Sequence, residues 1–91
     1  HISYQIENLL NLKTLNLSDN LIEELPSNIG NITELENLFL SGNRLKVLPK
    51  TIVNLKKLKW LSLVDNIELL ISEDQKNWIE ELKNYGCRVL I

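Results

Sequence analysis

Few side chains in this sequence belong to the types that carry out catalysis. The only histidine is His1, the only cysteine is Cys87, and acidic pairs such as Glu23 and Glu24 are adjacent in the chain, which is typical of a solvated surface. The sequence contains no glycine-rich phosphate loop and no metal-ligand spacing. We therefore predict a chain that is not an enzyme, with no catalytic residue, no metal ligand and no cofactor.

A small set of aromatic side chains is better suited to binding. Phe39 is the only phenylalanine, and Trp60 is one of two tryptophans in the 91 residues. Aromatic side chains held on a rigid polar surface are frequent anchors of protein interfaces. Whether these two side chains can act in this way depends on the elements that position them.

Three copies of one leucine pattern organise the chain. The clearest copy is residues 35–45, L-E-N-L-F-L-S-G-N-R-L, and related copies begin at residues 12 and 58, each 23 residues after the previous one. An L-P-x-x-I segment follows the first two copies, at residues 25–29 and 48–52. A period of roughly 20–29 residues with the pattern L-x-x-L-x-L-x-x-N-x-L is the signature of the leucine-rich repeat. The chain thus resembles the C-terminal part of an array of leucine-rich repeats of the LPxxI type.

The resemblance implies an α/β fold, a leucine-rich-repeat solenoid. It has a curved parallel sheet on the concave face, short helical or 3-10 segments on the convex face, and a capping helix and strand at the C-terminal end. Side chains alternate between the faces of a strand, so one set of leucines should line the core. These leucines are Leu15, Leu17, Leu38, Leu40, Leu61 and Leu63. Asn20, Asn43 and Asn66 should satisfy main-chain groups in the turns that follow the strands.

We expect one domain over residues 1–91. Its predicted parts are the back half of a truncated repeat (1–11), two full repeats (12–34 and 35–57), a degenerate last repeat (58–71) and a C-terminal cap (72–91). Terminal repeats normally need a cover over their apolar end. We therefore expect further repeats or a second subunit on the N-terminal side.

The last part of the chain departs from the repeat. Ser72 and Gln75 form a capping box for a helix, and the apolar positions that follow have helical spacing. They are Trp78, Ile79, Leu82 and Tyr85, which should cover the open core of the last repeat. Residues 87–91 should add a fourth parallel strand, with Cys87 buried and inert. The sequence leaves open whether Ile67 or Leu69 occupies the inward position before the cap.

Charge is distributed in blocks. The net charge is −2, but residues 44–60 hold six basic residues and no acidic one. This basic block could bind an acidic partner or nucleic acid. We favour a stacking role, because residues 23 apart are neighbours in the solenoid. That spacing pairs Glu23 with Lys46 and Glu34 with Lys57, and sets Lys13, Glu36 and Lys59 in a row of alternating sign. The overall acidity also argues against nucleic acid.

Two observations bear on the compartment. A single cysteine excludes an internal disulfide and favours a reducing, cytoplasmic location, although a secreted or cell-surface location stays open. No apolar run approaches the roughly 18 residues of a membrane span, so we expect no membrane insertion.

The resemblance implies that a protein partner docks on the concave face. The strand positions that point away from the core include two aromatic residues among small polar ones. The predicted partner-binding residues are Thr14, Asn16, Asn37, Phe39, Trp60, Ser62 and Val64, with a rim of Lys13, Asp19, Glu36, Lys59 and Asp65. Alternatively, Phe39 and Trp60 only shield each other.

Three functions are compatible with this sequence. The first is a non-catalytic protein-protein interaction module, such as a signalling scaffold. The second is a substrate-recruiting or regulatory arm of a larger signalling enzyme, for example a kinase, a GTPase or a ubiquitin ligase. The third is a structural or surface repeat protein of a bacterium or protist.

Overall fold

The computed structural model describes residues 10–91 and contains four strands, two 3-10 segments and one α-helix in that range. In chain order they are β1 (Thr14–Asn16), η2 (Ser27–Asn31), β2 (Asn37–Phe39), η3 (Lys50–Asn54), β3 (Trp60–Ser62), α1 (Glu73–Asn84) and β4 (Arg88–Leu90). Most of the predicted truncated repeat over residues 1–11 lies outside the described residues.

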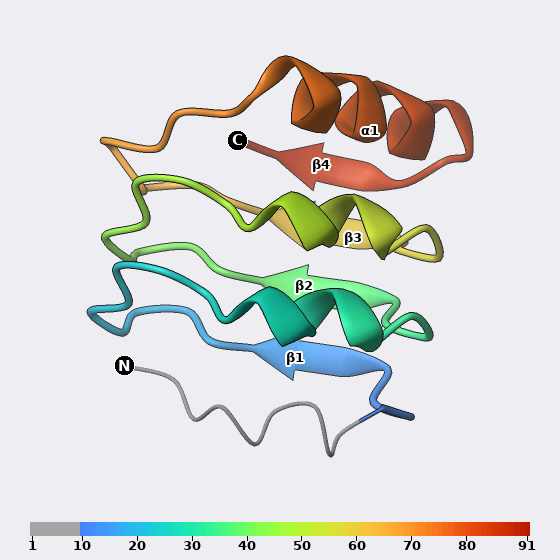
Figure 1. Ribbon diagram of the computed structural model, residues 1–91, viewed down its shortest axis with the longest axis horizontal. Coiled ribbons are helices and arrows are strands. Elements are labelled where there is room, and N and C mark those ends of the chain that lie inside the picture. Colours follow the sequence, from blue (N-terminus) through green and yellow to red (C-terminus); the bar gives the residue numbers. More distant parts are fainter. Residues whose placement is uncertain (1–9) are drawn as a thin grey trace.

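The four strands form one parallel sheet in the order β1-β2-β3-β4, which confirms the predicted solenoid. Figure 1 shows the strands stacked in chain order, with η2 and η3 packed side by side on one side of the sheet and α1 at the end of the stack. Thr14 pairs with Asn37, and Asn37 pairs with Trp60, so the register follows the 23-residue repeat. Both 3-10 segments begin directly after a proline with a φ near −65°, a conformation that suits the start of a helical turn.

The core is a continuous layer of leucine and isoleucine between the sheet and the 3-10 segments. The inward leucines of the two central repeats are at most 2% exposed: Leu38, Leu40, Leu61 and Leu63. Leu15 and Leu17 pack against this core but are only partly buried. Among the described residues, β1 has a neighbouring strand on one side only, and this accounts for the difference.

Asparagines close the turns after the strands. The side chain of Asn43 is buried; its Oδ1 accepts from two main-chain N–H groups at 3.1 and 3.2 Å, and its Nδ2 donates to the carbonyls of Leu17 and Leu40 at 3.0 Å. Asn66 repeats this arrangement in the next repeat. Asn20 is exposed, and within residues 10–91 its side chain donates to carbonyls of its own turn. The predicted ladder is therefore confirmed at its two buried positions.

Helix α1 covers the last repeat with one buried face along its length, formed by Gln75, Trp78, Ile79 and Leu82. The predicted capping box is present, with reciprocal hydrogen bonds of 3.2 Å between Ser72 and Gln75. The Gln75 amide also donates to the carbonyl of Leu48 at 3.1 Å, and Trp78 Nε1 donates to the carbonyl of Leu55 at 3.0 Å. The cap is thus fastened to the preceding repeat by polar contacts as well as by apolar ones.

Tyr85 is 88% exposed, so the prediction that it covers the core is wrong. It is the C-cap residue, where the chain leaves the helix before Gly86, and its side chain no longer follows the buried helical face. The open choice between Ile67 and Leu69 is decided in favour of Leu69, which packs against the core while Ile67 is exposed.

Ion pairs between repeats follow the prediction in part. Lys57 Nζ lies 2.8 Å from a carboxylate oxygen of Glu34, as expected, and Lys59 pairs with Glu36 at 3.7 Å. Lys13 pairs with Glu34 at 3.5 Å and not with Glu36. The Glu34 carboxylate thus lies between the ammonium groups of Lys13 and Lys57. The ion pairs of residues 10–91 do not include the predicted pair of Glu23 and Lys46.

No helix between residues 10 and 91 is long and apolar enough to cross a membrane.

Candidate functional site

The concave face of the sheet carries side chains in rows, because its parallel strands are in register. We define this face by the outward positions of β1 to β4. Its first row is Thr14, Asn37, Trp60 and Arg88, and its second row is Asn16, Phe39, Ser62 and Leu90. All seven predicted contact residues except Val64 lie in these rows, and Val64 lies two residues after the end of β3.

Apart from Phe39, the outward side chains of β1 and β2 are polar and form hydrogen bonds within this part of the face. Asn37 Nδ2 donates to Thr14 Oγ1 at 3.0 Å, and Ser41 Oγ donates to Ser18 Oγ at 3.1 Å. Asn16 Oδ1 accepts from the main-chain N–H of Ser18 at 3.0 Å. These groups already have partners, so this part offers a solvated surface and few free donors.

The rest of the face, from Phe39 on β2 across β3 to β4, is dominated by aromatic and basic groups. The ring centroids of Phe39 and Trp60 lie 6.0 Å apart, with an interplanar angle of 67°, so the rings meet edge to face. The Arg88 guanidinium carbon lies 4.9 Å from the centre of the Trp60 ring, in cation-π contact. Trp60 keeps 36% of its surface exposed between these neighbours. The two aromatic residues therefore shield each other and still present surface to solvent.

Two predicted contact residues are less accessible than the pattern indicated. Ser62 is only 7% exposed, because its small side chain stands between Phe39 and Leu90 on the neighbouring strands. Val64 is half-buried. Little of Ser62 is left for a partner to contact.

Arg88 was not among the predicted contact residues, although a fourth strand was predicted for residues 87–91. A spacing of 23 residues from Trp60 leads to Lys83 and not to Arg88. The structure pairs Trp60 with Arg88, because α1 is longer than the 3-10 segment of an ordinary repeat. Strand alternation within residues 87–91 was the available signal, since it sends Arg88 and Leu90 to the concave face.

Charge on this face is sparse and one-sided. Arg88 is the only charged side chain in the two rows, and within residues 10–91 it has no ion-pair partner. At the start of the strands the rim residues Lys59 and Glu36 neutralise each other. At the other end, Asp19 and Asp65 are exposed in turns where both have positive φ angles. The face is thus basic where the strands begin and acidic where they end.

The equivalent turn of the second repeat contains a glycine, Gly42, where the first and third repeats have Asp19 and Asp65. Gly42 has a φ of 70°, and a Cβ atom built there would lie 2.3 Å from Oδ1 of Asp19. A side chain at Gly42 would therefore collide with the acidic rim as well as strain the main chain. The rim at this end is a close stack of turns.

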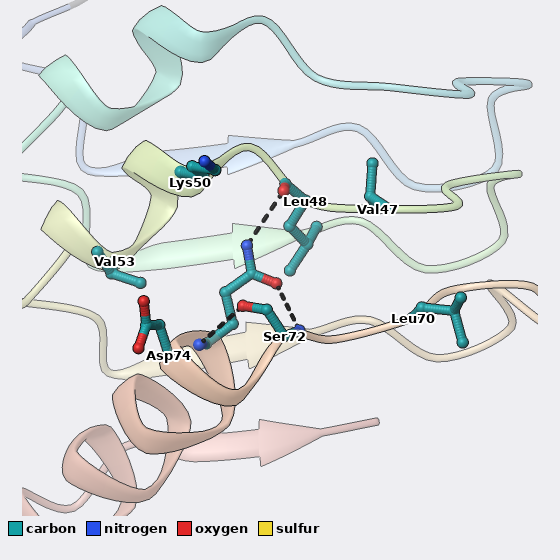
Figure 2. Close-up of a pocket in the computed structure, with 8 residues that line it drawn as sticks. Val47, Leu48, Lys50, Val53, Leu70, Ser72 and Asp74 are labelled. Atoms are coloured by element: carbon teal, nitrogen blue, oxygen red, sulfur yellow. Dashed lines mark hydrogen bonds between the residues drawn. The ribbon is translucent and has the colours of Figure 1, made fainter.

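A cavity lies on the convex side, between η3 and the start of α1 (Figure 2). Its volume is about 450 Å³, and it is lined by Val47, Leu48, Lys50, Val53, Leu70, Ser72, Asp74 and Gln75. The hydrogen bonds drawn in Figure 2 join Gln75 to Ser72 and to the carbonyl of Leu48. The polar groups at its base thus serve the helix cap, and the cavity lacks a set of reactive side chains.

The ionisable groups do not form a reactive centre in the part of the chain that the structure describes. No group of three or more His, Cys, Asp or Glu side chains within residues 10–91 could hold a metal ion. Burial raises the pKa of the Cys87 thiol, which keeps the sulfur in its unreactive protonated form. The hydrogen bond from Lys57, together with its charge, lowers the pKa of the exposed Glu34. These shifts belong to packing and to a surface ion pair.

Comparisons with known proteins agree with this geometry. The family model described as Leucine-rich repeat region matches residues 1–85. Among solved structures, 13 chains match, including a leucine-rich repeat protein of Leptospira interrogans that is 36% identical, with a TM-score of 0.76. That match covers 99% of this chain and 22% of the Leptospira chain, so this chain spans about a fifth of its length. No curated protein matches the sequence significantly. The repeat pattern, the parallel sheet and both matches show that the chain belongs to the leucine-rich repeat family.

Proposed function

We propose that this chain is a non-catalytic protein-protein interaction module that binds its partner through the concave face. The observation that carries the proposal is the exposed aromatic pair of Phe39 and Trp60 on an otherwise polar sheet. Leucine-rich repeat domains generally bind protein partners, and the concave face is their usual docking surface.

The physical argument is one of preorganisation. Phe39 and Trp60 lie on neighbouring strands of a hydrogen-bonded sheet over a close-packed core. Their side chains would therefore lose little conformational entropy when a partner binds. Aromatic side chains supply a large contact area for few rotatable bonds, and they dominate binding energy at many interfaces. The polar residues over β1 and β2 would then form the solvated margin of the contact.

A second candidate is a structural or surface repeat protein of a bacterium. The observation that favours it is the likeness to the much longer Leptospira protein. In that case the chain would be one segment of a long array, and its concave face would be part of a larger surface. A recruiting or regulatory arm of a signalling enzyme and a cytoplasmic location stay predictions from the sequence.

The test is a binding experiment with a double variant. Tagged wild-type protein and a Phe39→Ala, Trp60→Ala variant are used to retain proteins from a lysate, and affinities for the purified partner are then measured. Tyr85→Ala is the matched control, because it also removes a large aromatic side chain, but from an exposed position outside the sheet. Circular dichroism must first show that all three proteins are equally folded.

We expect the double variant to lose at least roughly tenfold in affinity, since aromatic anchors of this kind are frequent hot spots. The Tyr85→Ala control should bind like the wild type. A partner that binds the double variant and the wild type equally would show that the aromatic residues are only a packing pair. The proposed binding face would then be wrong.

A further inference from the structure

We propose that Arg88, together with the exposed surfaces of Trp60, Phe39 and Leu90, forms a subsite for one acidic side chain of the partner, an Asp or Glu that is flanked by a large apolar residue. This inference rests on the proposed function, because it names the chemistry of the partner at the same face. It is carried by a separate group, Arg88, which belongs to the cap and not to the repeats.

The Arg88 guanidinium is held against an aromatic ring. It lies over the Trp60 ring at 4.9 Å and has no carboxylate partner within residues 10–91. The contact with the ring positions the guanidinium, and an arginine so placed can direct two N–H donors to the two oxygens of a carboxylate.

Apolar side chains lie around the charge of Arg88. Trp60 is exposed to 36% and Leu90 to 42%, and Phe39 is half-buried beside Trp60. A carboxylate that approaches Arg88 therefore meets apolar surface contributed by three strands, β2, β3 and β4. The complementary segment carries a large apolar side chain next to the acid, because that side chain would cover the aromatic pair and exclude water from the ion pair.

The unpaired positive charge beside Trp60 is small. Lys59 precedes Trp60 in the chain, but its ammonium group is already paired with Glu36 at 3.7 Å. Arg88 is the one charged side chain in the two rows, and it has no ion-pair partner within residues 10–91, so it balances one negative charge. This suits a carboxylate better than a doubly charged phosphate group. The exposed Asp19 and Asp65 at the other end of the strands also disfavour a strongly acidic partner. The subsite thus fits a single acid within an apolar segment.

The test uses a phage-displayed library of random 12-residue peptides as the probe. Selections are run in parallel on the wild-type chain, on Arg88→Gln and on Lys50→Gln. Arg88→Gln removes the charge and keeps a polar side chain, and Lys50→Gln removes an exposed charge on η3, away from the sheet. Enriched peptides are synthesised both with amidated and with free C-termini, and each is also made with its acid replaced by Gln or Asn. Affinity is measured from the change in tryptophan fluorescence, since Trp60 is exposed and Trp78 is buried.

We expect the wild-type and Lys50→Gln proteins to enrich peptides that carry Asp or Glu within two residues of a large apolar side chain. Arg88→Gln should bind these peptides roughly five- to tenfold more weakly, in keeping with the loss of a charge-assisted hydrogen bond. Replacing the acid in the peptide should cost as much for the wild type and almost nothing for Arg88→Gln.

Other outcomes would overturn the subsite. If the selected peptides bind Arg88→Gln as tightly as the wild type but fail to bind Phe39→Ala, Trp60→Ala, the concave face binds protein and Arg88 plays no part in it. If binding depends on Arg88 only for peptides with a free C-terminus, the ligand group is the terminal carboxylate and not an acidic side chain. If no enriched peptide depends on Arg88 or on the aromatic pair, both the subsite and the binding face are wrong.

Discussion

At the scale of single residues, position in the stack decides what an asparagine contributes. Asn43 and Asn20 occupy equivalent places, 23 residues apart, yet Asn43 is buried and bonds to two repeats while Asn20 is exposed. A buried amide that satisfies main-chain groups on both sides ties one turn to the next. The same residue at the margin mostly serves its own turn.

We therefore expect the same substitution to have different effects at Asn43 and at Asn20. Asn43→Leu should lower the free energy of unfolding by roughly 2–4 kcal/mol, because it leaves buried donors and acceptors without partners. Asn20→Leu should cost less than about 1 kcal/mol, since water can replace its hydrogen bonds. Urea unfolding followed by circular dichroism measures both values. Equal losses in the two variants would contradict a role for Asn43 in joining repeats.

At the scale of elements, the helical cap depends on its first turn. Ser72 and Gln75 bond to each other, and Gln75 reaches the carbonyl of Leu48 in the preceding repeat. The capping box therefore starts α1, and one of its two members, Gln75, also fixes the helix to the solenoid. The apolar face of the helix then follows in position over the core.

The corresponding prediction concerns Gln75→Ala. We expect a loss of about 1–3 kcal/mol in stability, because the variant removes half of the capping box and leaves the Leu48 carbonyl without its donor. Amide hydrogen exchange should show faster exchange in α1 and β4 than in β2. Lys76→Ala, one position along on an exposed side chain, is the control and should leave exchange in α1 unchanged. Uniformly faster exchange over all strands would instead indicate a global effect.

The elements also show how far sequence reasoning reaches in this fold. The 23-residue period predicted the strands, their register and the inward leucines, because each repeat meets its neighbours through the same positions. The period fails at the cap, where α1 replaces a 3-10 segment and Arg88 lies beside Trp60. Tyr85 was misplaced for a related reason, since helical spacing alone does not say where a helix ends. Side-chain exposure at the concave face depended on the sizes of neighbours, as Ser62 shows.

At the scale of the whole molecule, the solenoid has stability only while its ends are covered. Each repeat contacts its neighbours alone, so the apolar layer of the last repeat must be closed by something other than a repeat. Here the buried side chains of α1 close it: Trp78, Ile79 and Leu82. Each such side chain contributes roughly 1.5–3 kcal/mol on burial, and domains are stable by only about 5–15 kcal/mol in total.

Removal of the cap should therefore unfold the molecule as a whole. A chain that ends at residue 71 lacks α1 and β4, and we expect it to lose its cooperative thermal transition and to associate through the exposed core of the last repeat. A chain that ends at residue 86 keeps α1 and lacks only the last strand, so it should still melt cooperatively, at a lower temperature than the full chain. Circular dichroism during heating and light scattering distinguish the two chains. Cooperative melting of the chain that ends at residue 71, near the temperature of the full chain, would mean that the repeats close their own core and that the cap serves only to carry Arg88 to the concave face.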